Sequence, residues 1–190
     1  MIMYDTGMLI GRFQPFHLGH SIILERALDQ CNKVIVVIGS AQESGTHLNP
    51  LSAAEREQII IDSFVNRLDS DSLEKIEFLH LNDRENWSND SSFGEYVINA
   101  IERTYGIIPK VIFEGKEASR NSWFDTIDID IVQISRNKCN ISGTKLREAI
   151  YNGDKLTWES QCAPGTEYCF DSIREAILNA TKDRSSNKLD

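Results

Sequence analysis

The apolar residues of this chain gather in short continuous runs, and longer amphipathic segments separate one run from the next. The runs rich in Ile, Val, Leu and Phe are the expected strands: Gly7–Ile10, Lys33–Ile38, Lys75–Leu81, Lys110–Glu114 and Ile129–Ile134. Several of them are apolar without alternation, which indicates strands that are covered on both faces. Such strands need helices on either side of their sheet, so the pattern favours an α/β fold.

The segments between these runs carry the signals of helices. The segment after the first run has apolar residues at helical spacing, namely Leu18, Ile22, Ile23 and Ala27. Ser52 and Glu55 match a capping box, which marks the start of another helix. Further helices are expected over Phe93–Tyr105, Gly143–Tyr151 and Asp171–Ala180. We therefore predict a Rossmann-like, doubly wound parallel sheet with helices on both faces and with ligands at the carboxyl ends of its strands.

The length of 190 residues suits a single domain, and the sequence shows no internal repeat or low-complexity linker. We expect residues 1–151 to form the core and residues 152–181 to form a helical extension of the same domain. Residues 182–190 are polar throughout most of their length, so we predict a disordered tail there.

The charge balance narrows the classes of partner. The chain has 20 Lys and Arg against 29 Asp and Glu, a formal net charge of −9. Binding along nucleic acid needs surplus basic residues, so we expect no nucleic-acid partner, whereas a phosphate ligand in one locally basic pocket stays compatible with this charge. No apolar run approaches the ~18 residues that span a bilayer, so we expect no membrane partner.

The cysteines indicate a cytoplasmic protein. Cys31, Cys139, Cys162 and Cys169 form no C-x-x-C pair, and Met1–Thr6 lacks the basic and apolar regions of a secretory signal. Unpaired cysteines without an export signal are typical of a reducing compartment. Cys162 and Cys169 have no histidine near them in the sequence, so we predict no zinc site and no other metal site on the protein itself.

The first motif with recognisable chemistry is Gly11–His20, G-R-F-Q-P-F-H-L-G-H, between the first expected strand and its helix. His17 and His20 lie three residues apart at a helix start, so both imidazoles can face one ligand. The amino end of the helix adds N–H groups and a partial positive charge, and Gly11 and Gly19 allow close backbone approach. We interpret this as a phosphate site of imidazoles and amides; the alternative is a pair of structural histidines that cap the helix.

The second motif is Ile141–Arg147, I-S-G-T-K-L-R, which follows the last expected strand and opens a helix. Ser142 can cap that helix and leave the Thr144 hydroxyl and the remaining amides for phosphate oxygens. Arg147 offers a planar guanidinium fork to the β- and γ-phosphates of a nucleotide. The alternative is a simple helix cap with Arg147 as a solvated surface residue. Neither a P-loop nor a G-x-G-x-x-G sequence is present.

Together the two motifs resemble the H-x-G-H and I-S-x-T-x-[IL]-R signatures of the nucleotidylyltransferase superfamily. The longer string G-R-F-Q-P-F-H-x-G-H is similar to archaeal-type nicotinamide-mononucleotide adenylyltransferases and to the transferase domain of proteins that fuse this enzyme to a Nudix hydrolase. The resemblance covers about Gly7 to Tyr151, and from the length of 190 residues we expect the transferase without a second domain. It implies an enzyme that joins nicotinamide mononucleotide and ATP to give NAD and pyrophosphate, with Mg²⁺ bound mainly through ATP.

The resemblance also implies roles for individual residues. The catalytic residues would be His17, His20 and Arg147. ATP and its phosphates would contact Gly11, Arg12, Phe13, Gln14, Gly19, Lys116, Arg136, Ser142, Gly143 and Thr144. The family pattern also includes G-S-A-Q, Asn49-Pro50, an E-R pair at Glu55-Arg56, and an aspartate followed by a tryptophan. From it we expect the nicotinamide nucleotide to contact Ser40, Gln42, Asn49, Asp83 and Trp87, with Phe93 as a rival aromatic for the ring.

One departure from the family keeps other functions open. The family usually carries Arg or Lys just before Asn-Pro, and this chain has Leu48 there, preceded by His47. Either His47 or another basic residue takes over, or the phosphate acceptor differs. The alternatives are a sister adenylyltransferase for nicotinate mononucleotide, phosphopantetheine or flavin mononucleotide, and a nucleotide-sensing module without catalysis. The sequence leaves the oligomeric state open; relatives often form homo-oligomers.

Overall fold

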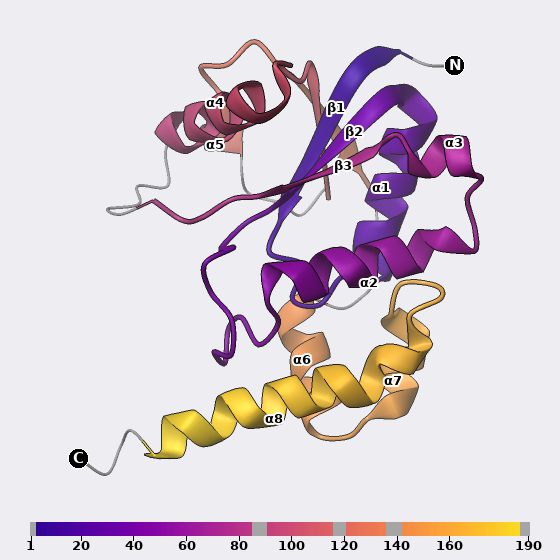
Figure 1. Ribbon diagram of the computed structural model, residues 1–190, viewed down its shortest axis with the longest axis vertical. Helices are drawn as coiled ribbons and strands as arrows, with labels where there is room; N and C mark the ends of the chain where they lie inside the picture. Colours follow the sequence, from indigo (N-terminus) through magenta and orange to yellow (C-terminus); the bar gives the residue numbers. More distant parts are fainter. Residues whose placement is uncertain (1–2, 85–90, 116–120, 136–141, 187–190) are drawn as a thin grey trace.

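A five-stranded parallel sheet forms the centre of the computed structural model, which describes residues 3–84, 91–115, 121–135 and 142–186 (Figure 1). Its strand order is β3-β2-β1-β4-β5. The strands are β1 (Tyr4–Gly11), β2 (Cys31–Ile38), β3 (Ile76–His80), β4 (Val111–Gly115) and β5 (Asp130–Ile134). The predicted parallel sheet is thus confirmed, with β1 starting three residues earlier than expected. The winding reverses between β1 and β4, and ligands of such sheets bind beside that switch.

The long helices follow the expected order. They are α1 (Leu18–Gln30), α2 (Ala53–Val65), α4 (Ser91–Tyr105), α6 (Gly143–Tyr151) and α8 (Phe170–Ser186). The capping box at α2 is confirmed, because the Ser52 side chain accepts from the Glu55 N–H and the Glu55 side chain accepts from the Ser52 N–H. Short elements escaped the sequence pattern because one turn or two give too few residues for periodicity: α3 (Ser70–Leu73), α5 (Asn121–Phe124), α7 (Lys155–Gln161) and the 3₁₀ turn η1 (Glu167–Cys169).

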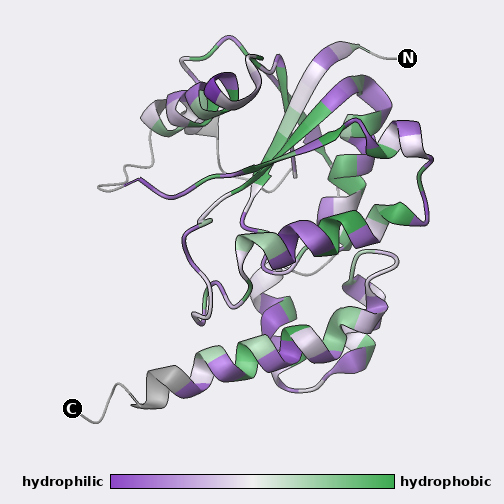
Figure 2. Ribbon diagram, viewed as in Figure 1, coloured by the Kyte–Doolittle hydropathy of each residue, from purple (hydrophilic) through white to green (hydrophobic). Residues whose placement is uncertain are grey.

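Helices cover both faces of the sheet. Along β2 the buried side chains alternate: Val34, Val36 and Ile38 join one apolar cluster, and Ile35 and Val37 join the other. The first cluster is completed by α1, α2, α6, α7 and α8, and the second by α4 and α5. Figure 2 shows hydrophobic colour concentrated on the central strands and on the inner sides of the helices. The doubly wound arrangement predicted from the unbroken apolar strands is therefore confirmed.

The residues after α6 pack against α1 and α2 and reach the first motif. The Trp158 side chain is fully buried, and its indole N–H donates to the Glu167 carbonyl over 3.0 Å. The backbone of Cys162 forms an isolated antiparallel bridge with His17. Helix α8 continues through Ser186, so the structure places residues 182–186 of the expected tail in this helix.

No helix within the described ranges is long and apolar enough to cross a membrane.

Replacing Trp158 tests how firmly this segment is attached. We expect Trp158→Ala to lower the free energy of unfolding by about 3–5 kcal/mol, because it empties a fully buried site and removes a hydrogen bond. The matched control is Leu156→Ala on the same helix, where the side chain is 80% exposed; it should change stability by less than about 0.5 kcal/mol. Urea unfolding of both variants measures the difference. Equal stability of the two variants would show that α7 is not part of the core.

Candidate active site

A cavity of about 480 Å³ opens at the carboxyl ends of the strands, where the reversal of winding places it. Its walls come from the end of β1, from the loops after β2 and β3, and from α4 and α5. The lining residues are Ile10, Gly11, Arg12, Gly39, Ser40, Asp83, Phe93 and Trp123. Gly11, Arg12, Ser40 and Asp83 were predicted from the sequence as ligand contacts, and they line this cavity. The predicted catalytic residues His17, His20 and Arg147 are not among its lining residues.

The two histidines of the first motif lie ring against ring. Their ring centroids are 3.8 Å apart. His17 is the N-cap of α1, and its Nδ1 accepts the Gly19 N–H over 3.1 Å. The ring of His20 contacts Phe13 edge-on and stacks on Phe16. The motif therefore combines both interpretations of the sequence, because His17 caps the helix and also stands beside His20.

The capping bond of His17 fixes which of its nitrogens carries a proton. A nitrogen that accepts a hydrogen bond has no proton, so in neutral His17 the proton is on Nε2. The side chain is 1% exposed, and the bridge from its backbone to Cys162 holds it from the other side. Nε2–H of His17 is thereby a donor in a fixed orientation, as phosphate oxygens require.

The second motif begins α6 as predicted. Ser142 caps the helix, with its hydroxyl accepting the Lys145 N–H over 3.3 Å. Arg147 is 8% exposed and donates to the Gln14 carbonyl over 2.6 Å and to the Thr144 hydroxyl over 3.3 Å. The alternative of a solvated surface arginine is therefore wrong. Gly143 permits this approach, because a Cβ there would lie 3.3 Å from the Gln14 oxygen.

Gln14 has a different task from the one expected. Its side chain is 4% exposed, and it exchanges two hydrogen bonds with the backbone of Leu51: Nε2 donates over 2.7 Å and Oε1 accepts over 3.0 Å. Both ends of the amide are thus occupied, and Gln14 lies outside the residues that line the cavity. Gln14 joins the loop after β1 to the start of α2 and carries the carbonyl that Arg147 binds.

Three residues expected to contact the nicotinamide nucleotide form one network. The Asp83 carboxylate accepts from the Ser40 hydroxyl over 3.2 Å and from the Gln42 amide over 3.1 Å, and Gln42 in turn accepts the Asp83 N–H over 3.0 Å. These bonds join the loops that follow β2 and β3. Ser40 and Asp83 line the cavity, whereas Gln42 lies outside its lining and both ends of its amide bond Asp83. The network therefore presents the Asp83 carboxylate, an acceptor suited to the N–H groups of a carboxamide ligand.

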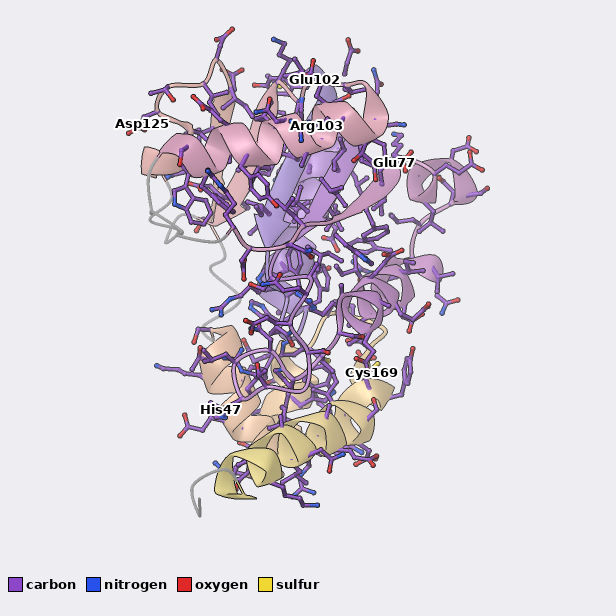
Figure 3. All side chains as sticks on the ribbon, turned by 60° about the vertical axis from the view of Figure 1, so that its left-hand side comes forward. His47, Glu77, Glu102, Arg103, Asp125 and Cys169 are labelled. Atoms are coloured by element: carbon purple, nitrogen blue, oxygen red, sulfur yellow. The ribbon has the colours of Figure 1, made fainter. Side chains whose placement is uncertain are left out.

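Asn49 and Leu48 lie on the long loop between β2 and α2. Asn49 is 3% exposed and donates to Glu43 over 2.9 Å, while its side-chain oxygen finds no hydrogen-bond partner among the described atoms. It does not line the cavity. Leu48 is 55% exposed, and His47, labelled in Figure 3, is exposed beside it. No Lys or Arg occurs between Gly39 and Leu51, so this loop brings no cation of its own.

Two aromatic rings form one wall of the cavity. Phe93, on α4, is 6% exposed, and its ring meets that of Trp123, on α5, edge to face with centroids 4.5 Å apart. The sequence pattern predicted Phe93 as a rival ring partner and did not predict Trp123. An aromatic residue shortly after the end of β4 was the signal that could have revealed it. Three other predicted residues, Trp87, Lys116 and Arg136, lie outside the described residues.

Arg56, which the sequence indicated only through its E-R pair, makes contacts that the sequence did not predict. Its side chain is fully buried, and the guanidinium donates to four backbone carbonyls: Ser52 over 3.0 Å, Arg12 over 2.9 Å, Gly39 over 2.7 Å and Ser40 over 3.2 Å. The E-R pair of the sequence pattern marked the position without revealing these contacts. Arg56 therefore connects the loops after β1 and β2 from below the cavity.

Positive charge gathers around the loop after β1. Burial lowers the pKa of Arg56 to about 10 and also lowers the pKa of Arg147, and the exposed Arg12 adds to both effects. A protein with a net charge of −9 thus has a local cluster of guanidinium groups beside its cavity. Such a cluster favours an anionic ligand.

In the part of the chain that the structure describes, no three His, Cys, Asp or Glu side chains are placed to hold a metal ion.

Comparisons with known proteins show the family of this chain. The model of the cytidylyltransferase-like family matches residues 8–149, and the chain belongs to this family. A curated relative from Acinetobacter baylyi, named nicotinamide/nicotinic acid mononucleotide adenylyltransferase, is 30% identical over 171 residues, which cover 87% of this chain and 85% of the relative. A nicotinamide-nucleotide adenylyltransferase from Thermococcus onnurineus is 32% identical over 161 residues, covering 83% and 77%.

A solved structure with the same fold comes from Francisella tularensis. It is described as a bifunctional NMN adenylyltransferase/ADP ribose pyrophosphatase complexed with AMP and a manganese ion. The TM-score is 0.76 at 23% sequence identity, and the match covers 97% of this chain and 54% of that protein. At this identity the likeness concerns the fold. The present chain spans about half of the bifunctional protein.

Gly94 offers a test of the aromatic wall. A Cβ at this position would lie 1.8 Å from the Trp123 carbonyl oxygen, so Gly94→Ala must push α5 away from α4. We expect a loss of about 1–3 kcal/mol in unfolding free energy and a shift in Trp123 fluorescence. The control is Glu95→Ala, an exposed neighbour on the same helix. An unchanged emission spectrum in a Trp123-only background would contradict the close contact.

Proposed function

We propose that this protein is a nicotinamide-nucleotide adenylyltransferase, which condenses nicotinamide mononucleotide with ATP to form NAD and pyrophosphate. The observation that carries the proposal is the meeting of the two motifs: His17 and His20 lie ring to ring, and Arg147 binds the backbone of the same loop. The names of relatives at 30% and 32% identity support this activity.

The reaction needs alignment more than reactive side chains. An oxygen of the mononucleotide phosphate attacks the α-phosphorus of ATP, the new P–O bond forms, and the bond to the β-phosphate oxygen breaks as pyrophosphate leaves in line. No covalent enzyme intermediate occurs. The protein must bring two anions together and neutralise the charge that moves onto the leaving oxygens. The guanidinium cluster and the imidazole pair supply this neutralisation.

Each side of the site takes one part of the nucleotides. His20 binds the α-phosphate in the transition state, and Nε2–H of His17 donates to the phosphate chain. Arg147, with Ser142 and Thr144 at the amino end of α6, holds the β- and γ-phosphates. Arg12 is exposed at the cavity and supplies the cation that the loop before Asn49 lacks.

The nicotinamide ring takes the other end of the cavity. The aromatic wall of Phe93 and Trp123 offers it a stacking surface, and the network of Ser40, Gln42 and Asp83 reads its carboxamide. The ATP phosphates and water, more than protein side chains, would hold Mg²⁺, because this ion gives up its hydration shell reluctantly. The described cysteines are free thiols, which supports a cytoplasmic location.

Pyrophosphate release tests the activity and the acceptor together. The protein is incubated with ATP, Mg²⁺ and either nicotinamide mononucleotide, nicotinate mononucleotide, phosphopantetheine or flavin mononucleotide. We expect release with the nicotinamide nucleotide. Release with phosphopantetheine or flavin mononucleotide alone would retain the chemistry and replace the substrate. If a folded protein that binds ATP releases no pyrophosphate with any of the four acceptors, it would be a nucleotide sensor.

His20→Ala should lower kcat by about 10²–10³-fold, because it removes a donor that acts on charge developing in the transition state. KM should change far less, since much of the binding surface is untouched. The control is His80→Gln, which alters an exposed histidine paired with Glu57 at the end of β3. Comparable losses in kcat and in the affinity of every ligand in His20→Ala would instead indicate a damaged fold.

The carboxylate of Asp83 should make the enzyme prefer the amide form of its substrate. A nicotinamide group can donate N–H to Asp83, whereas the carboxylate of nicotinate meets a like charge. In Asp83→Asn we expect the ratio of kcat/KM for the nicotinamide and nicotinate nucleotides to fall by about tenfold, for a change of about 1.4 kcal/mol. The ratio is its own control, because general damage lowers both values. An unchanged ratio would remove Asp83 from recognition of the ring.

A further inference from the structure

The loops after β1 and β2 each contain a residue in the left-handed region that is not glycine. Phe13 has φ 50° and Ser40 has φ 49°, and they are the non-glycine residues with positive φ in the described ranges. A backbone in this region costs about 1–3 kcal/mol for a residue with a side chain, and it persists only where the surroundings impose it. Some interaction must therefore hold both loops in shape.

The contacts of Arg56 coincide with these two positions. Its Nη1 binds the carbonyl oxygen of Arg12, which belongs to the peptide that enters Phe13. The same nitrogen binds the carbonyl of Gly39, and Nη2 binds the carbonyl of Ser40, so the peptides on both sides of Ser40 are fixed as well. One guanidinium thus holds the peptide groups beside both strained residues.

Because these peptides are trans, a bond that fixes the direction of the carbonyl also fixes the direction of the N–H in the same peptide. The N–H of a trans peptide points opposite to its carbonyl. With the Arg12 and Gly39 carbonyls directed at Arg56, the N–H groups of Phe13 and Ser40 point away from the guanidinium. Arg12, Gly39 and Ser40 line the cavity. A cation at the carbonyl end also polarises the peptide, which strengthens its N–H as a donor.

The contacts require an arginine. The planar guanidinium supplies its donors in one fixed plane, and here they meet carbonyls from three segments of chain. A lysine would bring the same charge with three donors around a single atom, and it could not span these carbonyls together. The role of Arg56 therefore depends on its shape as well as on its charge.

We propose that Arg56 is a positioning residue for adenylyl transfer, whose guanidinium sets the peptide planes after β1 and β2 so that the Phe13 and Ser40 amides face the phosphates of the two substrates. The proposal rests on the activity proposed above and adds a residue that touches neither substrate. Arg56 acts on the reaction through the distance and orientation of two loops, one on each side of the reacting phosphates.

The test compares three variants in the NAD-forming reaction. Arg56→Ala removes the guanidinium, and Arg56→Lys keeps the charge without the planar fork. The control is Arg67→Ala, which alters an arginine just beyond α2 that donates to Ser63, pairs with Glu25 and lies on the Phe64 ring, away from the cavity. Circular dichroism and thermal unfolding establish which variants are folded.

We expect kcat to fall by about 10²-fold in both Arg56 variants, because displaced reacting groups lose alignment, while KM for each substrate changes far less. Arg67→Ala should keep wild-type kcat. Guanidinium chloride, added to Arg56→Ala well below unfolding concentrations, should restore part of kcat by occupying the vacated site. Sodium chloride or urea at the same concentration should restore none.

Wild-type kcat in Arg56→Lys would overturn the proposal, since it would show that the fork is dispensable. Failure of guanidinium to restore a folded Arg56→Ala would also overturn it. If Arg56→Ala does not fold, Arg56→Lys decides: a fall confined to kcat supports positioning, and a rise confined to KM contradicts it. A wild-type protein that forms no NAD would refute the proposed activity itself, a result distinct from the failure of the Arg56 variants alone.

Discussion

The buried guanidinium groups of Arg56 and Arg147 donate to backbone oxygens of the loop that follows β1, one through Arg12 and the other through Gln14. The donors of both groups are directed at backbone carbonyls and, for Arg147, also at the Thr144 hydroxyl, while the Asp83 carboxylate favours the charged form of Arg56. Burying an arginine in this way costs solvation free energy, which the carbonyl bonds offset only in part. We expect an anionic ligand in the cavity to add to this compensation, so that binding of a phosphate would also stabilise the fold.

The sheet makes this concentration of charge feasible. Parallel strands direct all their carboxyl ends to one edge, and the reversal beside β1 separates the loops there enough to leave a cavity. In the segment after α6, the Cys162 backbone pairs with His17, and the buried Trp158 belongs to the same apolar cluster as α1 and α2. The histidine loop is thus held from the sheet and from the end of the chain.

Local patterns predicted much of this arrangement. The unbroken apolar runs predicted the strands, and the Ser52–Glu55 box and the Ser142 cap predicted two helix starts, because each signal lies within a few residues of its effect. The contacts of Gln14 with Leu51 and of Arg147 with Gln14 join residues 37 and 133 positions apart. Only the packed fold shows such partners, so the sequence could mark Gln14 and Arg147 as important and still misjudge what Gln14 binds. Trp123 and Arg56 escaped for the same reason.

The cap at the start of α1 couples helix structure to proton uptake. The Gly19 N–H is satisfied by a lone pair on Nδ1 of His17, and an imidazolium has no such lone pair. His17 can therefore gain a second proton only if the first turn of α1 gives up its cap. The cap therefore favours the neutral ring of His17 with its proton on Nε2, whereas the partner histidine 3.8 Å away lies within the helix and does not cap it. Two chemically identical side chains, three residues apart, are in this way made unequal by a single backbone amide.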